Sequence, residues 1–172
     1  MLRFEATKLR QLCVEVLKAL EIPDYESNVV ADHLVAADLR GVGTHGVRLL
    51  ADYVRRVQKG LINTKANIRV VRETTTTTVL DGDNGFGQVG GVRAMEAAIS
   101  KARNGGVGVA VISNTNHFGM LAYYPMMALK NGMIGVATCG TAASMPPWGG
   151  KARMLGNNPL AIAIPSGKER PI

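Results

Sequence analysis

The 172-residue sequence has little of several residue types, and each shortage argues against a class of protein. It has only two cysteines, Cys13 and Cys139, far apart and without metal-ligand spacing, which indicates a reducing compartment and no disulfide framework. No apolar run approaches the ~18 residues that a membrane-spanning helix needs, and the charged first dozen residues are unlike a signal peptide. We therefore expect a soluble, cytoplasmic protein without membrane contact.

Acidic residues are missing from a long stretch of the chain. No Asp or Glu lies between Glu96 and Glu169, whereas six lysines and arginines do, and the whole chain carries a net charge of +7. Scattered bases without acids suit an anionic small ligand, such as a carboxylate or a phosphate-bearing cofactor. Nucleic acid is less favoured, because the bases form no stripe and aromatic residues, at 5%, are too scarce for stacking.

Apolar residues make up 47% of the chain, which is ample for a core, and the length fits one domain or two small ones. They recur at helical spacing up to residue 60, after which β-rich and helical stretches alternate. We predict strands at 68–71, 75–80, 107–112, 133–138 and 160–164, and helices at 88–104 and 120–131. This order predicts an α/β fold: a helical segment (1–62), then a mixed sheet flanked by helices (63–172).

Residues with capping preferences mark the expected helix ends. Asp24 is the expected N-cap of the second helix, and Gly60 is the expected C′ residue of the third. The third helix is expected to begin near Thr44. That start would place His45 and Arg48, three residues apart, on one face of the first turn.

A glycine pattern between a predicted strand and a predicted helix resembles a dinucleotide-binding loop. Gly85, Gly87 and Gly90 match G-x-G-x-x-G, the pattern of a Rossmann site. Such a site also needs an acidic residue about twenty positions further on, at the end of the next strand, and none occurs there. Residues 81–84 are moreover typical of a turn. We therefore predict a structural turn and assign no cofactor binding to these glycines.

The chain has three histidines, and the first two lie in different contexts. His33 lies among apolar residues of the second predicted helix, where a packed or surface histidine is expected. His45 follows Thr44, which can cap a helix or hydrogen-bond the imidazole, and precedes Arg48. A general acid beside a forked carboxylate-binding group is what reduction of a 2-oxo acid requires. The same pattern also fits an ordinary surface helix start, so both interpretations stay open.

Two polar loops near predicted strands are further candidates. His117 lies in the loop after the strand 107–112, and ligand sites of α/β sheets form beyond the carboxyl ends of strands. A loop containing Asn157 precedes the last strand, where its amides could bind a ligand or make an Asn-Pro turn. The sequence contains no metal-ligand spacing, no lysine-containing phosphate loop and no serine nucleophile elbow.

Five motifs occur along the chain: Gly43-Thr-His-Gly46 with Arg48, Asp81-Gly-Asp-Asn-Gly-Phe-Gly-Gln88, Asn116-His-Phe-Gly119, Pro147-Trp-Gly-Gly150 and Gly156-Asn-Asn-Pro-Leu-Ala161. Together they resemble the malate/L-lactate dehydrogenase family of the non-Rossmann type, whose relatives include ureidoglycolate, sulfolactate and diketogulonate oxidoreductases. The resemblance implies hydride transfer between NAD or NADP and a 2-oxo or 2-hydroxy acid. It further implies a homodimer and an α/β fold distinct from the Rossmann fold.

The resemblance also implies roles for individual residues. His45 is similar to the family's proton donor to the carbonyl oxygen, Thr44 to its hydrogen-bonding partner, and Arg48 to the arginine that holds the substrate carboxylate. His117 is similar to a residue that contacts substrate as well as cofactor. The implied cofactor-lining segment consists of His117, Phe118, Gly119, Met120 and Leu121. Asn157 stands where many relatives have a threonine that contacts substrate.

Members of this family are roughly twice as long, so the chain resembles their N-terminal half and is expected to be truncated relative to them. The family aspartate that relays to the catalytic histidine, and much of the cofactor site, would lie outside it. Half an active site is not expected to work alone, because cofactor and acid must be positioned together. Two hypotheses follow: part of an oxidoreductase that a second polypeptide could complete, or a non-catalytic fragment that serves only folding or dimerisation.

Overall fold

A computed structural model describes residues 3–172 of the chain. Its first elements are α1 (Ala6–Lys18), α2 (Asp24–Leu39), the 3-10 turns η1 (Gly43–His45) and η2 (Val47–Leu49), and α3 (Leu50–Gln58). The others are β1 (Arg69–Glu73), β2 (Thr77–Gly85), α4 (Gly87–Gly105), β3 (Val109–Thr115), α5 (Tyr123–Leu129), β4 (Gly135–Thr138) and β5 (Leu160–Ala163). The order confirms the predicted α/β class, with helices first and a mixed sheet after them.

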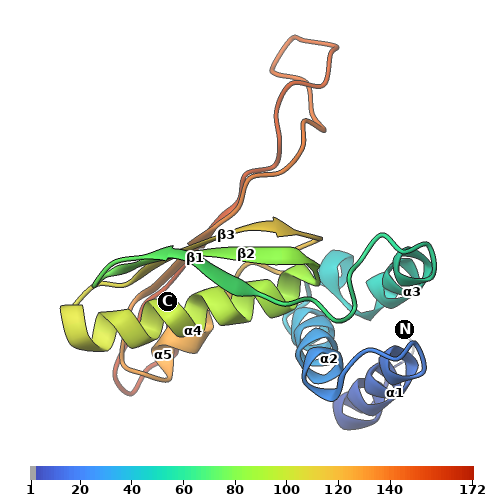
Figure 1. The fold of residues 1–172 in the computed structure, drawn as a ribbon, viewed down its shortest axis with the longest axis horizontal. Helices are drawn as coiled ribbons and strands as arrows, with labels where there is room; N and C mark the ends of the chain where they lie inside the picture. Colours follow the sequence, from blue (N-terminus) through green and yellow to red (C-terminus); the bar gives the residue numbers. More distant parts are fainter. Residues whose placement is uncertain (1–2) are drawn as a thin grey trace.

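The larger sheet places the carboxyl ends of two strands beside the helical segment. Its order is β1-β2-β3, with β1 antiparallel and β3 parallel to β2. Helix α4 connects β2 to β3 and lies along one face of this sheet (Figure 1). Helix and sheet approach closely because Gly90 of α4 packs directly against Ile112 of β3. Both parallel strands therefore end at the same edge, next to α2 and α3 (Figure 1).

The main apolar core lies where the first three helices meet the start of α4. Its buried members are Leu17, Ile22, Val30, Leu34, Tyr53, Ile62, Phe86 and Val89. These residues come from both sides of the boundary predicted between residues 62 and 63, so the helical segment packs directly on the sheet-bearing part. The division into two domains stays a prediction. In the part of the chain that the structure describes, no helix is long and apolar enough to span a membrane.

Strands β4 and β5 form a separate two-stranded antiparallel sheet that packs on α5. Residues 139–159, which connect these strands, form an extended arm that leaves the body of the molecule (Figure 1). Backbone pairing between Met145 and Leu155 joins the two sides of the arm. Trp148, between these two positions in sequence, is fully exposed.

The predicted third helix is wrong at its start. Instead of one helix from Thr44, the chain makes the two short turns η1 and η2 before α3 begins at Leu50. Gly46 separates the turns with an extended backbone (φ −87°, ψ −160°). The carboxylate of Asp38 accepts the Val47 N–H at 2.9 Å, so a side chain from α2 takes a backbone donor at this break.

Two further helix-end predictions have different outcomes. Pro23, and not Asp24, occupies the N-cap position of α2, because its fixed φ of −58° and extended ψ of 156° lead directly into the helix. Asp24 is the first helical residue. Gly60 follows the C-cap of α3 with a φ of 66°, which confirms its predicted place.

Strand β2 is longer than predicted, since it continues past Leu80 to Gly85. The turn-forming residues are present, but they bend the strand instead of ending it. Asp83 and Asn84 adopt positive φ values of 49° and 54°, and the pairing with β3 shifts register between Asp81 and Gly85. The bend is therefore a bulge at the end of a strand.

Candidate active site

Two of the predicted site histidines lie side by side, although they come from distant parts of the sequence. His45 is the last residue of η1, and His117 lies in the loop after β3. Their rings are stacked, with centroids 5.6 Å apart and an interplanar angle of 25°. Thr44 Oγ1 lies 2.9 Å from His45 Nδ1, which is the contact expected of this pair. The fold thus assembles two imidazoles from the helical segment and the sheet edge.

Two buried polar residues stand behind His117. The hydroxyl of Tyr53, from α3, lies 2.8 Å from His117 Nδ1. Gln88, near the start of α4, donates its Nε2–H to the Tyr53 oxygen at 2.6 Å. Tyr53 is 3% exposed and Gln88 is fully buried, so their geometry is set by the core and not by solvent.

The surroundings of His117 favour its neutral form. Partial desolvation lowers the pKa of His117, and the neighbouring His45 and Arg56 lower it further because a second positive charge would be repelled. Burial has the opposite effect on a phenol and raises the pKa of Tyr53 to about 12. At neutral pH we therefore expect an uncharged imidazole bonded to a protonated tyrosine.

His33, a fully buried residue of α2, holds the loop that carries His117 in place. His33 Nε2 accepts the backbone N–H of Met120 at 2.7 Å. Gly119 has a φ of 75°, and a Cβ there would overlap the His33 ring, so this position needs glycine. Burial, followed by the effects of His117 and His45, lowers the pKa of His33 to about 3. His33 is thus a packed histidine that shapes the loop.

The glycines of the G-x-G-x-x-G pattern each pack against protein atoms. A Cβ on Gly87 would overlap the backbone of Asn116 and His117, and one on Gly85 would overlap Ala66. Gly90 meets Ile112 in the same way. Close packing against protein atoms therefore gives a structural reason for glycine at each of the three positions. At Gly87 it also determines how near His117 comes to α4.

A basic cleft of about 540 Å³ opens next to His117. Its lining residues are Leu49, Asp52, Tyr53, Arg55, Arg56, Lys59, Leu61 and His117. Asp52 pairs with Arg55, whereas Arg56 donates to the neutral amide oxygen of Asn116 at 2.7 Å. Within residues 3–172, Arg56 and Lys59 have no carboxylate partner. The cleft therefore carries positive charge that suits an anionic ligand.

The predicted substrate-binding residues Arg48 and Asn157 are exposed, and described residues do not fix their side chains. Arg48 lies on η2, separated from His45 by the break at Gly46, so the two do not share the first turn of one α-helix. Arg48 is exposed and forms no ion pair with a described residue. Asn157 lies exposed on the arm, where its backbone N–H donates to Thr141 Oγ1 at 2.7 Å.

Of the predicted cofactor-lining segment, only the first part is open to a ligand. His117 is exposed and Phe118 is half-buried, whereas Met120 and Leu121 are buried, at 5% and 9% exposure. Leu121 packs in an apolar cluster with Val92 and Tyr124. The side chains of Met120 and Leu121 therefore support the loop from the core.

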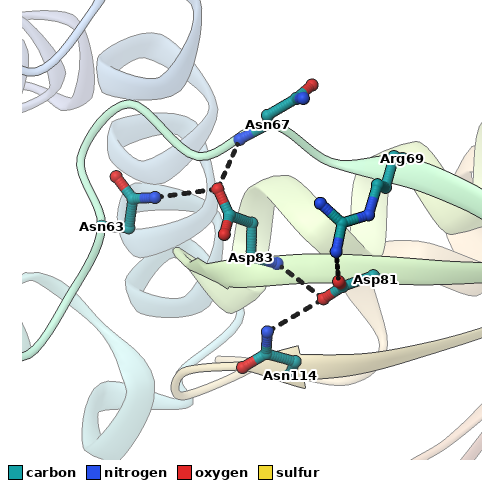
Figure 2. Close-up of polar contacts among 6 residues, drawn as sticks. All are labelled: Asn63, Asn67, Arg69, Asp81, Asp83 and Asn114. Atoms are coloured by element: carbon teal, nitrogen blue, oxygen red, sulfur yellow. Dashed lines mark hydrogen bonds and ion pairs between the residues drawn. The ribbon is translucent and has the colours of Figure 1, made fainter.

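A network of carboxylates and amides fixes the sheet edge on which the site rests (Figure 2). Asp83 accepts hydrogen bonds from Asn63 Nδ2 and from the backbone N–H of Asn67, at 2.9 and 3.0 Å, and so ties the linker after α3 to the end of β2. Asp81 accepts from Asn114 and Arg69. Hydrogen bonds from the Asp83 backbone and from Asn114 lower the pKa of Asp81.

Sequence reasoning missed Tyr53, Gln88 and the structural use of His33. Tyr53 fits the apolar face of an amphipathic helix, so nothing in the local pattern separates it from an ordinary core residue. Gln88 gives a weak signal, as a polar residue between glycine and valine at a buried helix start. For metals, the outcome is simpler: among residues 3–172, no group of three His, Cys, Asp or Glu side chains could hold an ion.

Stacked imidazoles beside a basic cleft, on a mixed α/β scaffold, define a candidate enzyme site for a small anionic substrate. The model of the malate/L-lactate dehydrogenase family matches residues 4–172. The chain therefore belongs to the malate/L-lactate dehydrogenase family, which confirms the resemblance seen in its motifs.

Individual relatives agree with this assignment. The chain is 43% identical over 159 residues to the L-sulfolactate dehydrogenase of Methanocaldococcus jannaschii, covering 92% of this chain and 46% of that protein. It is 42% identical over 170 residues to the malate dehydrogenase of Pyrococcus horikoshii, covering 99% and 47%. The chain thus spans about half the length of the curated relatives it matches.

Solved structures give the same result for the fold. The malate dehydrogenase of Pyrococcus horikoshii superimposes with a TM-score of 0.93 at 43% identity, over 99% of this chain and 49% of that one. The malate dehydrogenase of Entamoeba histolytica gives a TM-score of 0.94 at 39% identity, over 99% and 47%. The chain has the fold of one half of these enzymes.

Proposed function

We propose that this chain forms part of an oxidoreductase that transfers a hydride between NAD or NADP and a 2-oxo or 2-hydroxy acid, as in malate- and lactate-type dehydrogenases. The observation that carries the proposal is the stacked pair of His45 and His117 beside a basic cleft. Membership of the family supports the reaction class. The cytoplasmic location stays a prediction.

In this proposal His45 gives a proton to the carbonyl oxygen as negative charge builds up there. Thr44 holds its Nδ1 side, which leaves Nε2 for the substrate. Arg48 binds the substrate carboxylate through two parallel hydrogen bonds, for which its exposed guanidinium is free. Asn157, on the arm, contributes a further amide to the substrate.

Two features of the described residues support binding of a nicotinamide cofactor: the positive charge of the cleft and the open edge beside it. Arg56 and Lys59 supply positive charge for an anionic ligand, and His117 with Phe118 offers an open edge beside it. Gly119, Met120 and Leu121 complete the cofactor-lining segment as its buried support. The cofactor would supply the hydride, while the chain's own residues bind, orient and protonate. A homodimer, or a second polypeptide, is proposed to complete the site.

Substrate binding can be tested through Arg48. Arg48→Lys keeps the charge but loses the planar fork, so we expect about tenfold weaker binding of the 2-oxo acid, with a smaller effect on turnover. The measurement is the Michaelis constant for a panel of 2-oxo acids, from the loss of NADH or NADPH absorbance, in a chimera whose residues 4–172 replace the matching segment of the Pyrococcus horikoshii malate dehydrogenase. An unchanged Michaelis constant would remove Arg48 from the site.

The second candidate is a non-catalytic module that serves only folding or dimerisation. It is favoured by one observation, that the chain spans about half of its relatives. Direct titration of the same chimera separates the two candidates. A dehydrogenase site quenches NADH fluorescence and responds to a 2-oxo acid, whereas a folding module does neither.

A further inference from the structure

The proposed roles leave two buried polar side chains without a task. Tyr53 and Gln88 lie in the core beneath His117, at 3% and 0% exposure. Sequence patterns assigned neither residue a role of its own, and of the two only Tyr53 lines the cleft. Polar groups are expensive to bury unless their hydrogen bonds are made, so their arrangement calls for a reason.

The donors and acceptors of Gln88, Tyr53 and His117 determine the direction of the hydrogen bonds between them. The amide nitrogen of Gln88 can only donate, so at 2.6 Å the Tyr53 oxygen accepts. The single hydroxyl proton of Tyr53 is then free to be donated, and His117 Nδ1 lies 2.8 Å away. An imidazole nitrogen that accepts a hydrogen bond carries no proton. A neutral His117 therefore has its proton on Nε2.

The observed direction leaves an oxygen of Gln88, and not its amide nitrogen, without a partner among residues 3–172. Turning the amide over would place its oxygen against Tyr53 and move both N–H groups to the present position of Oε1. Buried N–H groups without partners are rarer in proteins than under-used carbonyl oxygens. In the observed direction one amide N–H is used and Oε1 is the unpartnered atom.

We propose that Gln88 and Tyr53 are positioning residues that hold His117 as a neutral hydrogen-bond donor, with its Nε2–H directed to an oxygen of the bound ligand. Nε2 forms no hydrogen bond to any residue in the range 3–172, and it lies on the ring edge opposite the Tyr53 contact. The inference rests on the proposed function, because the oxygen would belong to the carbonyl or carboxylate of a 2-oxo acid.

This arrangement gives the stacked histidines different tasks. His45 has to carry a positive charge when it protonates the substrate, and a charged His117 at a centroid distance of 5.6 Å would oppose that charge. Desolvation and the nearby Arg56 already lower the pKa of His117, and the raised pKa of Tyr53 keeps the proton on the phenol. These electrostatic effects keep His117 neutral but do not select which ring nitrogen carries its proton. The hydrogen bonds from Gln88 to Tyr53 and from Tyr53 to His117 make that selection.

The test is the protonation site of His117 in the 172-residue chain labelled with ¹⁵N-histidine. Three histidines give three pairs of ring nitrogens, assigned by replacing each histidine in turn. His33 serves as the internal reference, because its Nε2 accepts the Met120 N–H and its proton must lie on Nδ1. We expect the two residues to show opposite tautomers near neutral pH. A proton on Nδ1 of His117 would overturn the proposal.

Two variants test the origin of the effect. In Tyr53→Phe we expect the His117 Nδ1 resonance to move to the position of a free acceptor while both His33 resonances stay in place. Gln88→Met should convert the single tautomer of His117 into a mixture, since nothing then forces the Tyr53 oxygen to accept. Tyr25→Phe is the matched control, because Tyr25 is half-exposed and stacks on Arg93 instead. An unmoved Nδ1 resonance in Tyr53→Phe would contradict the proposal.

These measurements separate the inference from the proposed function. The tautomer is observed without cofactor, substrate or turnover, so a failure of the dehydrogenase assays leaves its result intact. Conversely, His117 with its proton on Nδ1 removes the positioning role and leaves hydride transfer standing. If Tyr53→Phe does not fold, the spectrum of the unaltered chain decides by itself.

Discussion

The loop after β3 and the arm between β4 and β5 both carry residues predicted to meet the ligand, but they are built differently. The loop is held on three sides, by the imidazole of His33, by the hydroxyl of Tyr53 and by close packing on Gly87. The arm is extended and exposed, and among residues 3–172 Asn157 is hydrogen-bonded only through its backbone. The orientation of His117 is thus determined by described residues, whereas that of the Asn157 side chain is not.

Replacing a glycine by alanine should separate the two regions most clearly. Gly119 and Gly149 have the same φ of 75°, but only Gly119 faces another side chain, the buried ring of His33. We expect Gly119→Ala to cost about 3 kcal/mol or more in the free energy of unfolding, from backbone strain plus overlap, and Gly149→Ala about 1 kcal/mol. Urea unfolding measures both. Equal costs would mean that the loop yields as easily as the arm.

Acid should weaken the loop and leave the arm unaffected. The pKa of His33 is about 3 in the folded chain, against about 6.5 when unfolded, so protons favour the unfolded state. The contribution of His33 to the free energy of unfolding is complete above about pH 6.5. It decreases as the pH is lowered, by up to about 1.4 kcal/mol per pH unit. The arm has neither a histidine nor a carboxylate.

The matched variant for this pH dependence is His33→Gln, which cannot titrate. Between pH 7 and 4, urea unfolding should show a smaller decrease in the free energy of unfolding per pH unit in His33→Gln than in the unaltered chain. The difference in slope should correspond to the uptake of about one proton on unfolding. The same slope in both proteins would show that His33 is already exposed to solvent in the folded state.

The smallest effect is expected on the arm itself. Trp148 is fully exposed, so Trp148→Ala should change the free energy of unfolding by no more than about 0.5 kcal/mol. Thermal unfolding at two protein concentrations provides the measurement. A cost above about 1 kcal/mol that grows with concentration would show that the arm packs on another molecule in solution.

Features that depend on local sequence pattern could be predicted, whereas features that depend on tertiary contacts could not. The alternation of strands and helices, and the motifs around His45 and His117, were enough for the fold class and the family, because both depend on local pattern. The turns at Gly46 depend on the carboxylate of Asp38, which lies in another helix, so no local pattern shows them. Asp24 was displaced from its cap by the preceding proline.

The roles of the polar residues behind the site could not be predicted, because they too depend on tertiary contacts. Tyr53 and Gln88 acquire their role only when α3 and α4 meet at the edge of the sheet, and their sequence contexts are those of ordinary buried residues. His33 was expected to be packed or on the surface, and its bond to Met120 required the loop to fold over α2. Tertiary contacts of this kind leave no periodic pattern in the sequence.

The most direct test of the central claim is the effect of His45→Ala on turnover. Residues 4–172 can replace the matching segment of the Pyrococcus horikoshii malate dehydrogenase, to which the chain is similar over 99% of its length. With malate and NAD or NADP, we expect this chimera to be active and His45→Ala to lower its turnover by about 10²- to 10⁴-fold, with little change in substrate binding. An active chimera whose turnover survives His45→Ala would contradict the role of His45 as the proton donor.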